Sequence, residues 1–376
     1  MPNAFLSSRL FALDGLRVFA VIAVFTFHAY SDRMLGGEVG VDVFFVLSGF
    51  VITLLLLREW TATRRIRFGR FYVLRLARLW PALLAMCAAV AVIAIFRHDL
   101  LYRNGATDAL WGALYVENIV RAATPTDGLT ASPIGHTWTL GVEEQFYLLW
   151  PLLLVILLRW FSLRKATIIT AALAVVPLGL RIAFWHAGAG ANRVSNSLDT
   201  RADQLLFGCV LALVLVGWPT LAMWFQRISR FAMWPALAAL VWIALFFPAR
   251  TMTGTLLGYH DRYGFVVTGL LAATVICGLA TNASSLLTRG LSVRWLRWPG
   301  RNLSYGFYLW HYPVLGMIPA LGGPQSVRVA VAFAITTLLA LLSWRFIERP
   351  VRQWAQDRLS RREQMVAAGV PVDAAA

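Results

Sequence analysis

Residues 39–57 of the chain read VGVDVFFVLSGFVITLLLL, an apolar stretch in which Asp42 is the single charged residue. A helix needs about 20 mostly apolar residues to cross the hydrocarbon core of a bilayer, so this stretch predicts a membrane-spanning helix. Similar stretches recur along the chain, at 11–30, 79–96, 138–158, 166–187, 202–218, 231–248, 263–280, 303–319 and 327–347. We therefore expect an all-α integral membrane protein, a bundle of about ten transmembrane helices.

The composition of the whole chain supports this expectation. Hydrophobic residues make up 59% of the 376 residues and charged residues 14%, and the mean hydropathy is +0.67. Soluble domains carry about 25% charged residues, and one core cannot bury so large an apolar surplus. We expect residues 1–350 to form a membrane domain. Residues 351–376 are basic and then rich in alanine, and we expect them to be a disordered cytoplasmic tail.

The positive charge of the chain indicates its orientation in the membrane. The net charge is +16, and Lys165 is the only lysine, so arginine carries nearly all of it. Binding of nucleic acid would need a water-exposed basic face, whereas these arginines stand between apolar stretches. Basic connections alternate with connections poor in cations, and they lie at 58–78, 159–165, 227–230 and 289–301. Because cationic loops stay in the cytoplasm, we expect these connections and both termini there.

The cysteines and histidines give no sign of a disulfide or a metal site. Cys87, Cys209 and Cys277 each lie inside an apolar stretch, and no two of them form a CxxC pair. The six histidines include no HExxH motif, so we expect no bound metal.

The first apolar stretch holds three ionisable residues, which are candidates for function because such residues are costly in a membrane. At 100° per residue, Asp14, Arg17 and His28 fall on one side of a helix, with His28 roughly 16 Å from Arg17 along the axis. Asp42 is expected near His28 in depth, so Asp42 or Asp14 could hold the imidazole as a general base. The alternative is that Asp14 and Arg17 form an ion pair that only fixes packing.

Two later stretches carry further polar residues. The segment His136-Thr-Trp-Thr-Leu-Gly-Val-Glu-Glu-Gln-Phe-Tyr147 puts Glu143 and Tyr147 on one helix face, although a structural ion pair with an arginine would also explain its glutamates. In Ser304-Tyr-Gly-Phe-Tyr-Leu-Trp-His311, Ser304 and His311 share a face. The aromatic residues of that segment also suit a purely structural role at the membrane interface.

The basic connection before the third stretch is a candidate site for an anionic ligand. Arg70, Arg75 and Arg78 approach the membrane from the expected cytoplasmic side, with Arg75 and Arg78 one helical turn apart. Such a pair can clamp a phosphate by charge-assisted hydrogen bonds. Membrane topology alone would also explain the cluster.

Taken in order, these motifs resemble those of the acyltransferase family 3 membrane proteins, the O-acetylases of lipopolysaccharide, peptidoglycan and related glycans. The matching pieces are Leu13-Asp-Gly-Leu-Arg17, His28, the run 40–50, Arg75-x-x-Arg78, Trp138-x-Leu140 with 143–147, Arg201-x-Asp203 with Gly208, Ser304-Tyr305, Tyr308-Leu-Trp-His311 with Pro313, and Glu348-Arg-Pro350. The resemblance implies a multi-pass protein of the bacterial cytoplasmic membrane. It also implies cytoplasmic acyl-CoA, acetyl-CoA first, as co-substrate, with no permanently bound cofactor.

The resemblance implies roles for individual residues and a class of acceptor. It points to His28 as the base and to Arg75 and Arg78, beside Arg70, as the donor site. In the mechanism we expect, His28 takes the proton of an acceptor hydroxyl, and the alkoxide attacks the thioester carbonyl. Tyr147, Arg17 or His311 then stabilises the oxyanion. A relay through an acyl-histidine is an alternative route.

The acceptor is expected to be a saccharide, an envelope glycan, or a glycosylated or macrolide-type small molecule. Many members of the family carry a soluble domain after the membrane part, and we expect acceptors that require such a domain to be less suited to this chain. A transporter or proton-coupled exporter is the alternative to an enzyme. It would explain the intramembrane carboxylates Asp14, Glu143 and Glu144 equally well.

Overall fold

The computed structural model describes residues 10–30, 34–97, 99–124, 132–247, 260–320 and 322–367, which form helices and contain no strand. Nine helical segments of this described part are long and apolar enough to cross a bilayer. They are α2 (Phe11–Ala29), α3 (Val39–Thr63), α4 (Phe68–Phe96), η2 with α7 (Gly135–Thr137, Trp138–Trp160), α8 with α9 (Leu163–Leu173, Val176–His186), α10 with α11 (Ala191–Asn196, Leu198–Gly217), α12 (Pro219–Phe246), η3 with α14 (His260–Gly264, Phe265–Thr281), and the run of α18, η5 and α19 (Gln325–Ser343, Trp344–Glu348, Arg349–Ala367). The prediction of an all-α, multi-pass membrane protein is confirmed.

The predicted span 303–319 is shorter in the structure than we expected. It forms α17 (Ser304–Met317) followed by a single turn, η4 (Ile318–Ala320). At 1.5 Å per residue α17 is roughly 21 Å long, which is less than the roughly 30 Å of a hydrocarbon core. The helix packs against α2 and α18, and Leu309 and His311 on it are fully buried. It therefore lies inside the bundle as a short helix with protein on most sides.

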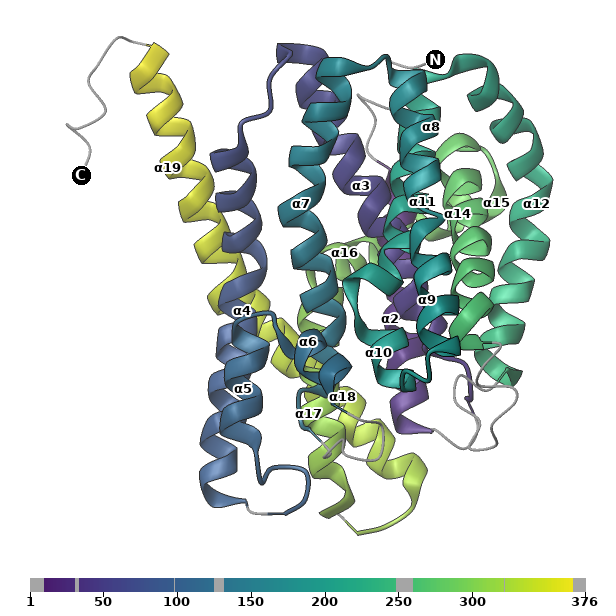
Figure 1. Cartoon of the computed structure of the whole chain (residues 1–376). Helices are drawn as coiled ribbons and strands as arrows, with labels where there is room; N and C mark the ends of the chain where they lie inside the picture. Colours follow the sequence, from purple (N-terminus) through teal and green to yellow (C-terminus); the bar gives the residue numbers. More distant parts are fainter. Residues whose placement is uncertain are drawn as a thin grey trace.

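The connections between helices gather at the two ends of the bundle. The α3–α4, α7–α8 and α11–α12 connections lie at the upper end in Figure 1. The opposite end holds α5 (Gly105–Ala113), α6 (Glu117–Ala123), α10 and the hairpin of α17 and α18. This alternation agrees with the alternation of basic and cation-poor connections in the sequence. Two more short helices, α15 (Leu286–Leu291) and α16 (Arg294–Asn302), precede α17.

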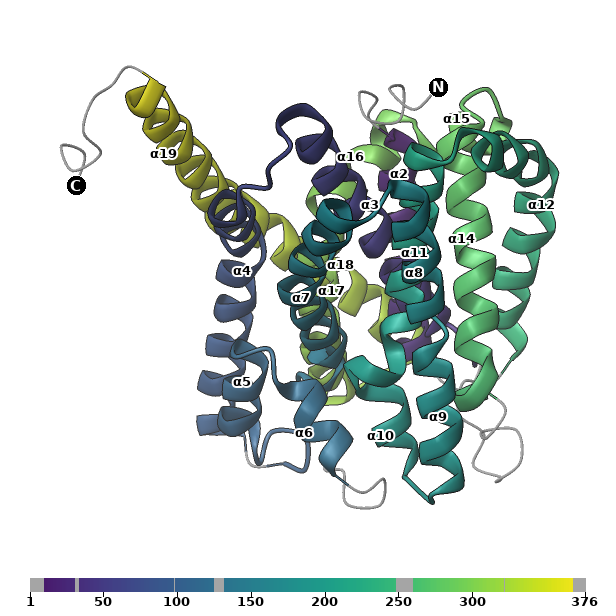
Figure 2. The same ribbon diagram turned by 45° about the horizontal axis from the view of Figure 1, so that its top comes forward.

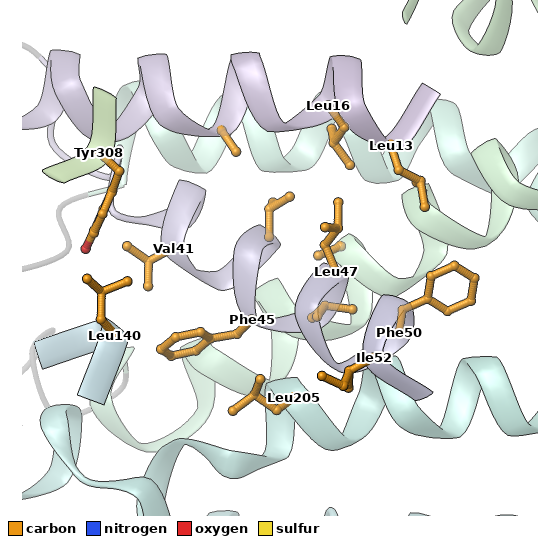
Figure 3. Packing of buried hydrophobic residues seen from close by; sticks show 14 of the residues in the cluster. Leu13, Leu16, Val41, Phe45, Leu47, Phe50, Ile52, Leu140, Leu205 and Tyr308 are labelled. Atoms are coloured by element: carbon orange, nitrogen blue, oxygen red, sulfur yellow. The ribbon is translucent and has the colours of Figure 1, made fainter. Parts of the chain in front are cut away.

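Glycine allows α3 and α11 to approach until their backbones touch. A Cβ atom on Gly49 of α3 would lie 1.8 Å from the Leu205 carbonyl oxygen, and one on Gly208 of α11 would lie 2.0 Å from the Val46 carbonyl oxygen. Small residues at such crossings are typical of membrane helices, where close van der Waals packing replaces the hydrophobic effect. Figure 3 shows the apolar side chains beside this contact, among them Leu205 and Phe45.

Buried ion pairs join α3, α9 and α11, and a hydrogen bond adds α14. Arg201 donates to Asp42 at 2.8 Å, and the two side chains are almost entirely buried. Thr268 donates to the second Asp42 oxygen at 2.7 Å. Arg181 pairs in the same way with Asp203. Buried charges require such partners, so these pairs fix which helix faces meet.

The segment 351–376 differs from the disordered tail that we predicted. Its residues up to Ala367 belong to α19, which continues α18 through the π-helical turn η5 and runs beside α4 (Figure 1, Figure 2). Ala355 is buried, and Glu363 accepts hydrogen bonds from Arg67 and Arg70 of the α4 region. The segment up to Ala367 is therefore a helix in contact with α4. The alanine-rich residues 368–376 lie outside the described part.

Candidate active site

A cavity of about 810 Å³ lies between α2, α3, α4, α7, α17 and α19. It follows α3 from Arg58 to Val41, roughly 26 Å of helix at 1.5 Å per residue. Arg58, Arg75 and Arg78 line one end of it, which we call the cationic end, and Tyr308 and Leu140 line the other, inner end. A cavity of this volume is within the range of ligand sites in proteins.

Arginine dominates the charged lining of this cavity. The lining cations are Arg17, Arg58, Arg75, Arg78, Arg301 and Arg352, and the lining carboxylates are Asp14 and Glu143. Arg17 pairs with Asp14 at 3.1 Å, as one of our two interpretations of the first helix expected. No carboxylate of the described residues lies within ion-pair distance of Arg78 or Arg352, and the Arg78 side chain is exposed. The cationic end of the cavity therefore has an excess of positive charge, which favours an anionic ligand.

A glutamate and a tyrosine of α7 hold Arg75 at the cavity wall. The Arg75 guanidinium pairs with Glu144 at 3.0 Å and lies 3.1 Å from the centroid of the Tyr147 ring. Ser48 of α3 donates to Glu143 at 2.8 Å. The ion pair with an arginine that we considered for these glutamates is thus present at Glu144, while Glu143 faces the cavity.

Arg70 lies apart from this cavity. It donates two hydrogen bonds to Glu363, at 2.7 and 2.8 Å, and does not belong to the lining. The structure therefore does not place Arg70 in the same cavity as Arg75 and Arg78, contrary to our prediction. The positions five and eight residues after Arg70 point elsewhere because 100° per residue turns them to another face of α4.

A hydrogen-bonded tyrosine, Tyr308, lines the inner end of the cavity. The Tyr308 hydroxyl lies 2.6 Å from Thr139 Oγ1 and donates to the His136 carbonyl at 2.8 Å. Figure 3 shows the Tyr308 ring pointing toward Val41 and Leu140, which also line the cavity. Side chains of α3, α7 and α17 thus meet at this end.

Three histidines lie directly behind Tyr308. His28 Nδ1 is 3.1 Å from His311 Nε2, and the centroids of the His311 and His136 rings are 5.1 Å apart. The ring of Tyr312 packs against both His28 and His136. His136 and His311 are buried, whereas His28 is half-buried. The tertiary structure therefore brings His28 and His311 together, from helices more than 280 positions apart in the sequence.

The structure separates several residues that we had placed in one reaction centre. Arg17 is eleven residues before His28 on the same helix, and Tyr147 is eleven residues after His136, which is roughly 16 Å in each case. Arg17 and Tyr147 therefore lie toward the arginines rather than beside His28, and neither can donate to an oxyanion at His28. Both oxygens of Asp42 accept hydrogen bonds, from Arg201 and Thr268.

Comparison with known proteins identifies the family of the chain. Residues 10–345 match the acyltransferase domain that defines acyltransferase family 3. The chain belongs to this family. It is similar to the peptidoglycan O-acetyltransferase OatA of Listeria monocytogenes, with 34% identity over 91% of this chain and 56% of the relative. It is also similar to the O-acetyltransferase OatA of Staphylococcus aureus, with 33% identity over 91% of this chain and 57% of the relative.

The chain thus spans just over half the length of these family members. No solved structure matches it. As a member of acyltransferase family 3 with nine apolar spans in its described part, it is a multi-pass membrane protein with an acyltransferase domain.

Some cavity residues of this family member were missed in the sequence. In the sequence Arg301 belonged to a basic connection and Arg352 to a tail that we expected to be disordered, yet both line the cavity. Thr139 and Tyr308 stood inside quoted motifs without a role, and both line the inner end, where they contact each other. Only a pairing of α7 with α17 could have revealed that contact.

Proposed function

We propose that the chain transfers an acyl group, an acetyl group first, from acyl-CoA to a hydroxyl of a cell-envelope saccharide. The observation that carries this proposal is a cavity with a cationic end and an inner end lined by Tyr308, beside which His311 and His28 lie. The printed names of the relatives, O-acetyltransferases and in one case of peptidoglycan, support a glycan acceptor. A glycosylated or macrolide-type small molecule is the second acceptor class that the proposal allows.

The orientation follows from the charges of the connections. The basic connections and the cationic end of the cavity face the cytoplasm, together with both termini, because cationic loops remain there. Cytoplasmic acyl-CoA then enters at its own side of the membrane, and the acceptor reaches His28 from the opposite side.

Arg78, Arg301 and Arg352 bind the phosphates of the donor in this proposal. Arg78 and Arg352 have no ion-pair partner in the described part. A phosphate can therefore pair with their guanidinium groups without displacing a carboxylate. Arg75 attracts the phosphates through its electrostatic potential without binding them directly, since Glu144 already holds its guanidinium. Apolar lining residues, including Phe71 and Leu54, accompany the pantetheine arm toward Tyr308.

The chemistry takes place at His28. Its imidazole accepts the proton of the acceptor hydroxyl while that oxygen forms a bond to the thioester carbonyl carbon. The carbon–sulfur bond then breaks, and the CoA thiolate takes the proton from His28. The thioester must pass Tyr308 to reach this point, so the contact of Tyr308 with Thr139 has to open during the reaction.

Transfer of radiolabelled acetyl from acetyl-CoA in inverted membrane vesicles tests the proposal. His28→Ala should abolish label in the glycan fraction. Arg78→Ala should raise KM for acetyl-CoA roughly 10- to 100-fold, the loss expected for a hydrogen bond to a charged group of about 1.5–3 kcal/mol. Arg70→Ala is the matched control, because Arg70 pairs with Glu363 outside the cavity, and it should leave KM within about twofold.

Two outcomes would reject the proposal. Full activity of His28→Ala would show that His28 is not the base. Equal changes of KM in Arg78→Ala and Arg70→Ala would show that Arg78 is not part of the donor site. A transporter would instead move a solute in response to a proton gradient, with no label in any acceptor and no dependence on acetyl-CoA.

A further inference from the structure

The hydrogen bond between His28 and His311 has a direction that the neighbouring backbone fixes. His311 Nδ1 lies within hydrogen-bond distance of the Tyr308 carbonyl oxygen. A carbonyl oxygen only accepts, so Nδ1 of His311 must carry a proton. If His311 is neutral, its Nε2 has no proton and can only accept. The 3.1 Å contact with His28 Nδ1 is then a bond in which His28 donates.

The surroundings of His311 favour its neutral form. The side chain is fully buried, and no described carboxylate lies within ion-pair distance of it. The groups that face it are His28 from α2, His136 from η2, the Tyr308 and Tyr312 rings of its own helix, and the Phe25 ring of α2. None of these supplies a negative charge. A buried imidazolium without a counter-ion is costly, so His311 stays neutral.

We propose that His311 is a positioning residue that holds His28 in the tautomer with its proton on Nδ1 and its lone pair on Nε2. The inference rests on the proposed function, in which His28 is the base. It gives that base a defined basic atom, Nε2, and a fixed ring plane. It also removes His311 from the candidates for an oxyanion donor, because the Nε2 that faces His28 has no proton to give.

The proposed arrangement follows the general form of a base oriented by a third group, with a neutral imidazole in place of the usual carboxylate. The acceptor proton moves to His28 Nε2 as the new carbon–oxygen bond forms. The same proton leaves for the CoA thiolate after the carbon–sulfur bond breaks. His28 Nδ1–H remains donated to His311 throughout, and the bond strengthens while His28 is charged.

Two amide substitutions at His311 distinguish positioning from packing. The amide of glutamine reaches the position of Nε2, whereas that of asparagine reaches only that of Nδ1. His311→Gln can therefore accept from His28, and His311→Asn cannot. We expect His311→Gln to keep kcat within about 10-fold, and His311→Asn to lose at least about 100-fold, the lower range for general-base catalysis. KM for acetyl-CoA should change in neither, because the arginines are untouched.

Equal loss of kcat in the two variants, with normal melting temperatures in detergent, would overturn the positioning role but leave the proposed function intact. Full activity of His28→Ala would instead overturn the proposed function itself.

A measurement independent of activity covers the case in which His311→Asn does not fold. Nitrogen-15 NMR of histidine-labelled protein reports which ring nitrogen carries the proton, and His28→Ala assigns the His28 signals. We expect a protonated Nδ1 on His28 in the unsubstituted protein. A His28 protonated on Nε2 would contradict the inference.

Discussion

Removal of the Asp42 carboxylate separates its structural role from the catalytic role that the sequence suggested. Asp42 and Arg201 are 3% and 1% exposed, and they join α3 to α11 at 2.8 Å. Asp42→Ala leaves Arg201 as a buried charge without its carboxylate partner. The Phe265 ring still stacks on it, with the ring centroid 3.5 Å from the guanidinium carbon. Breaking such a pair costs about 3–5 kcal/mol. At roughly 2 °C per kcal/mol for a large domain, the melting temperature should fall by roughly 6–10 °C.

The matched control removes both charges. Asp42→Ala combined with Arg201→Met leaves no unpaired charge, and it should recover most of the lost melting temperature, because an apolar replacement for a buried pair is often neutral. Thermal unfolding in detergent, followed by tryptophan fluorescence, measures both variants. Acetyl transfer by both variants is also measured, at a temperature below the unfolding transition.

Two results would refute this reasoning. An unchanged melting temperature of Asp42→Ala would mean that the pair does not stabilise the crossing of α3 and α11. A double variant that is stable but inactive would mean that Asp42 takes part in the chemistry, as we first expected from its position in the sequence.

Three further predictions concern helix contacts and pH. Gly208→Val should prevent normal packing, since even a Cβ would lie 2.0 Å from a backbone oxygen, whereas Gly290→Ala, with nothing within 4 Å, should leave the yield of folded protein unchanged. Burial raises the pKa of Glu117 from 4.5 to about 7, so the folded state holds its proton where the unfolded chain has released it. Stability should therefore fall as pH rises from about 4.5 to about 7, and Glu117→Gln should flatten that slope in melting curves; an unaltered slope would contradict the assignment. Glu363→Ala removes an exposed pair and should change stability by less than about 1 kcal/mol, while a larger loss would mean that α19 depends on it.

The sequence by itself predicted the helical type of the fold and the position of nine of the ten expected spans. Apolar length alone predicts a spanning helix, because the bilayer requires every backbone group to be satisfied within the segment. The spacing within one helix also identified the polar side of α2, where Asp14 and Arg17 do form a pair. Such features depend on neighbours within a few residues, and helical geometry makes them readable.

The tertiary structure alone decided which polar residues meet. Arg70 and Arg78 are alike in sequence, yet one pairs with Glu363 and the other faces the cavity. His28 meets His311 because α2 packs against α17. These partners come from helices far apart in the chain, and their choice depends on which helix faces pack together. No local spacing encodes that choice, so the candidate active site required the assembled bundle.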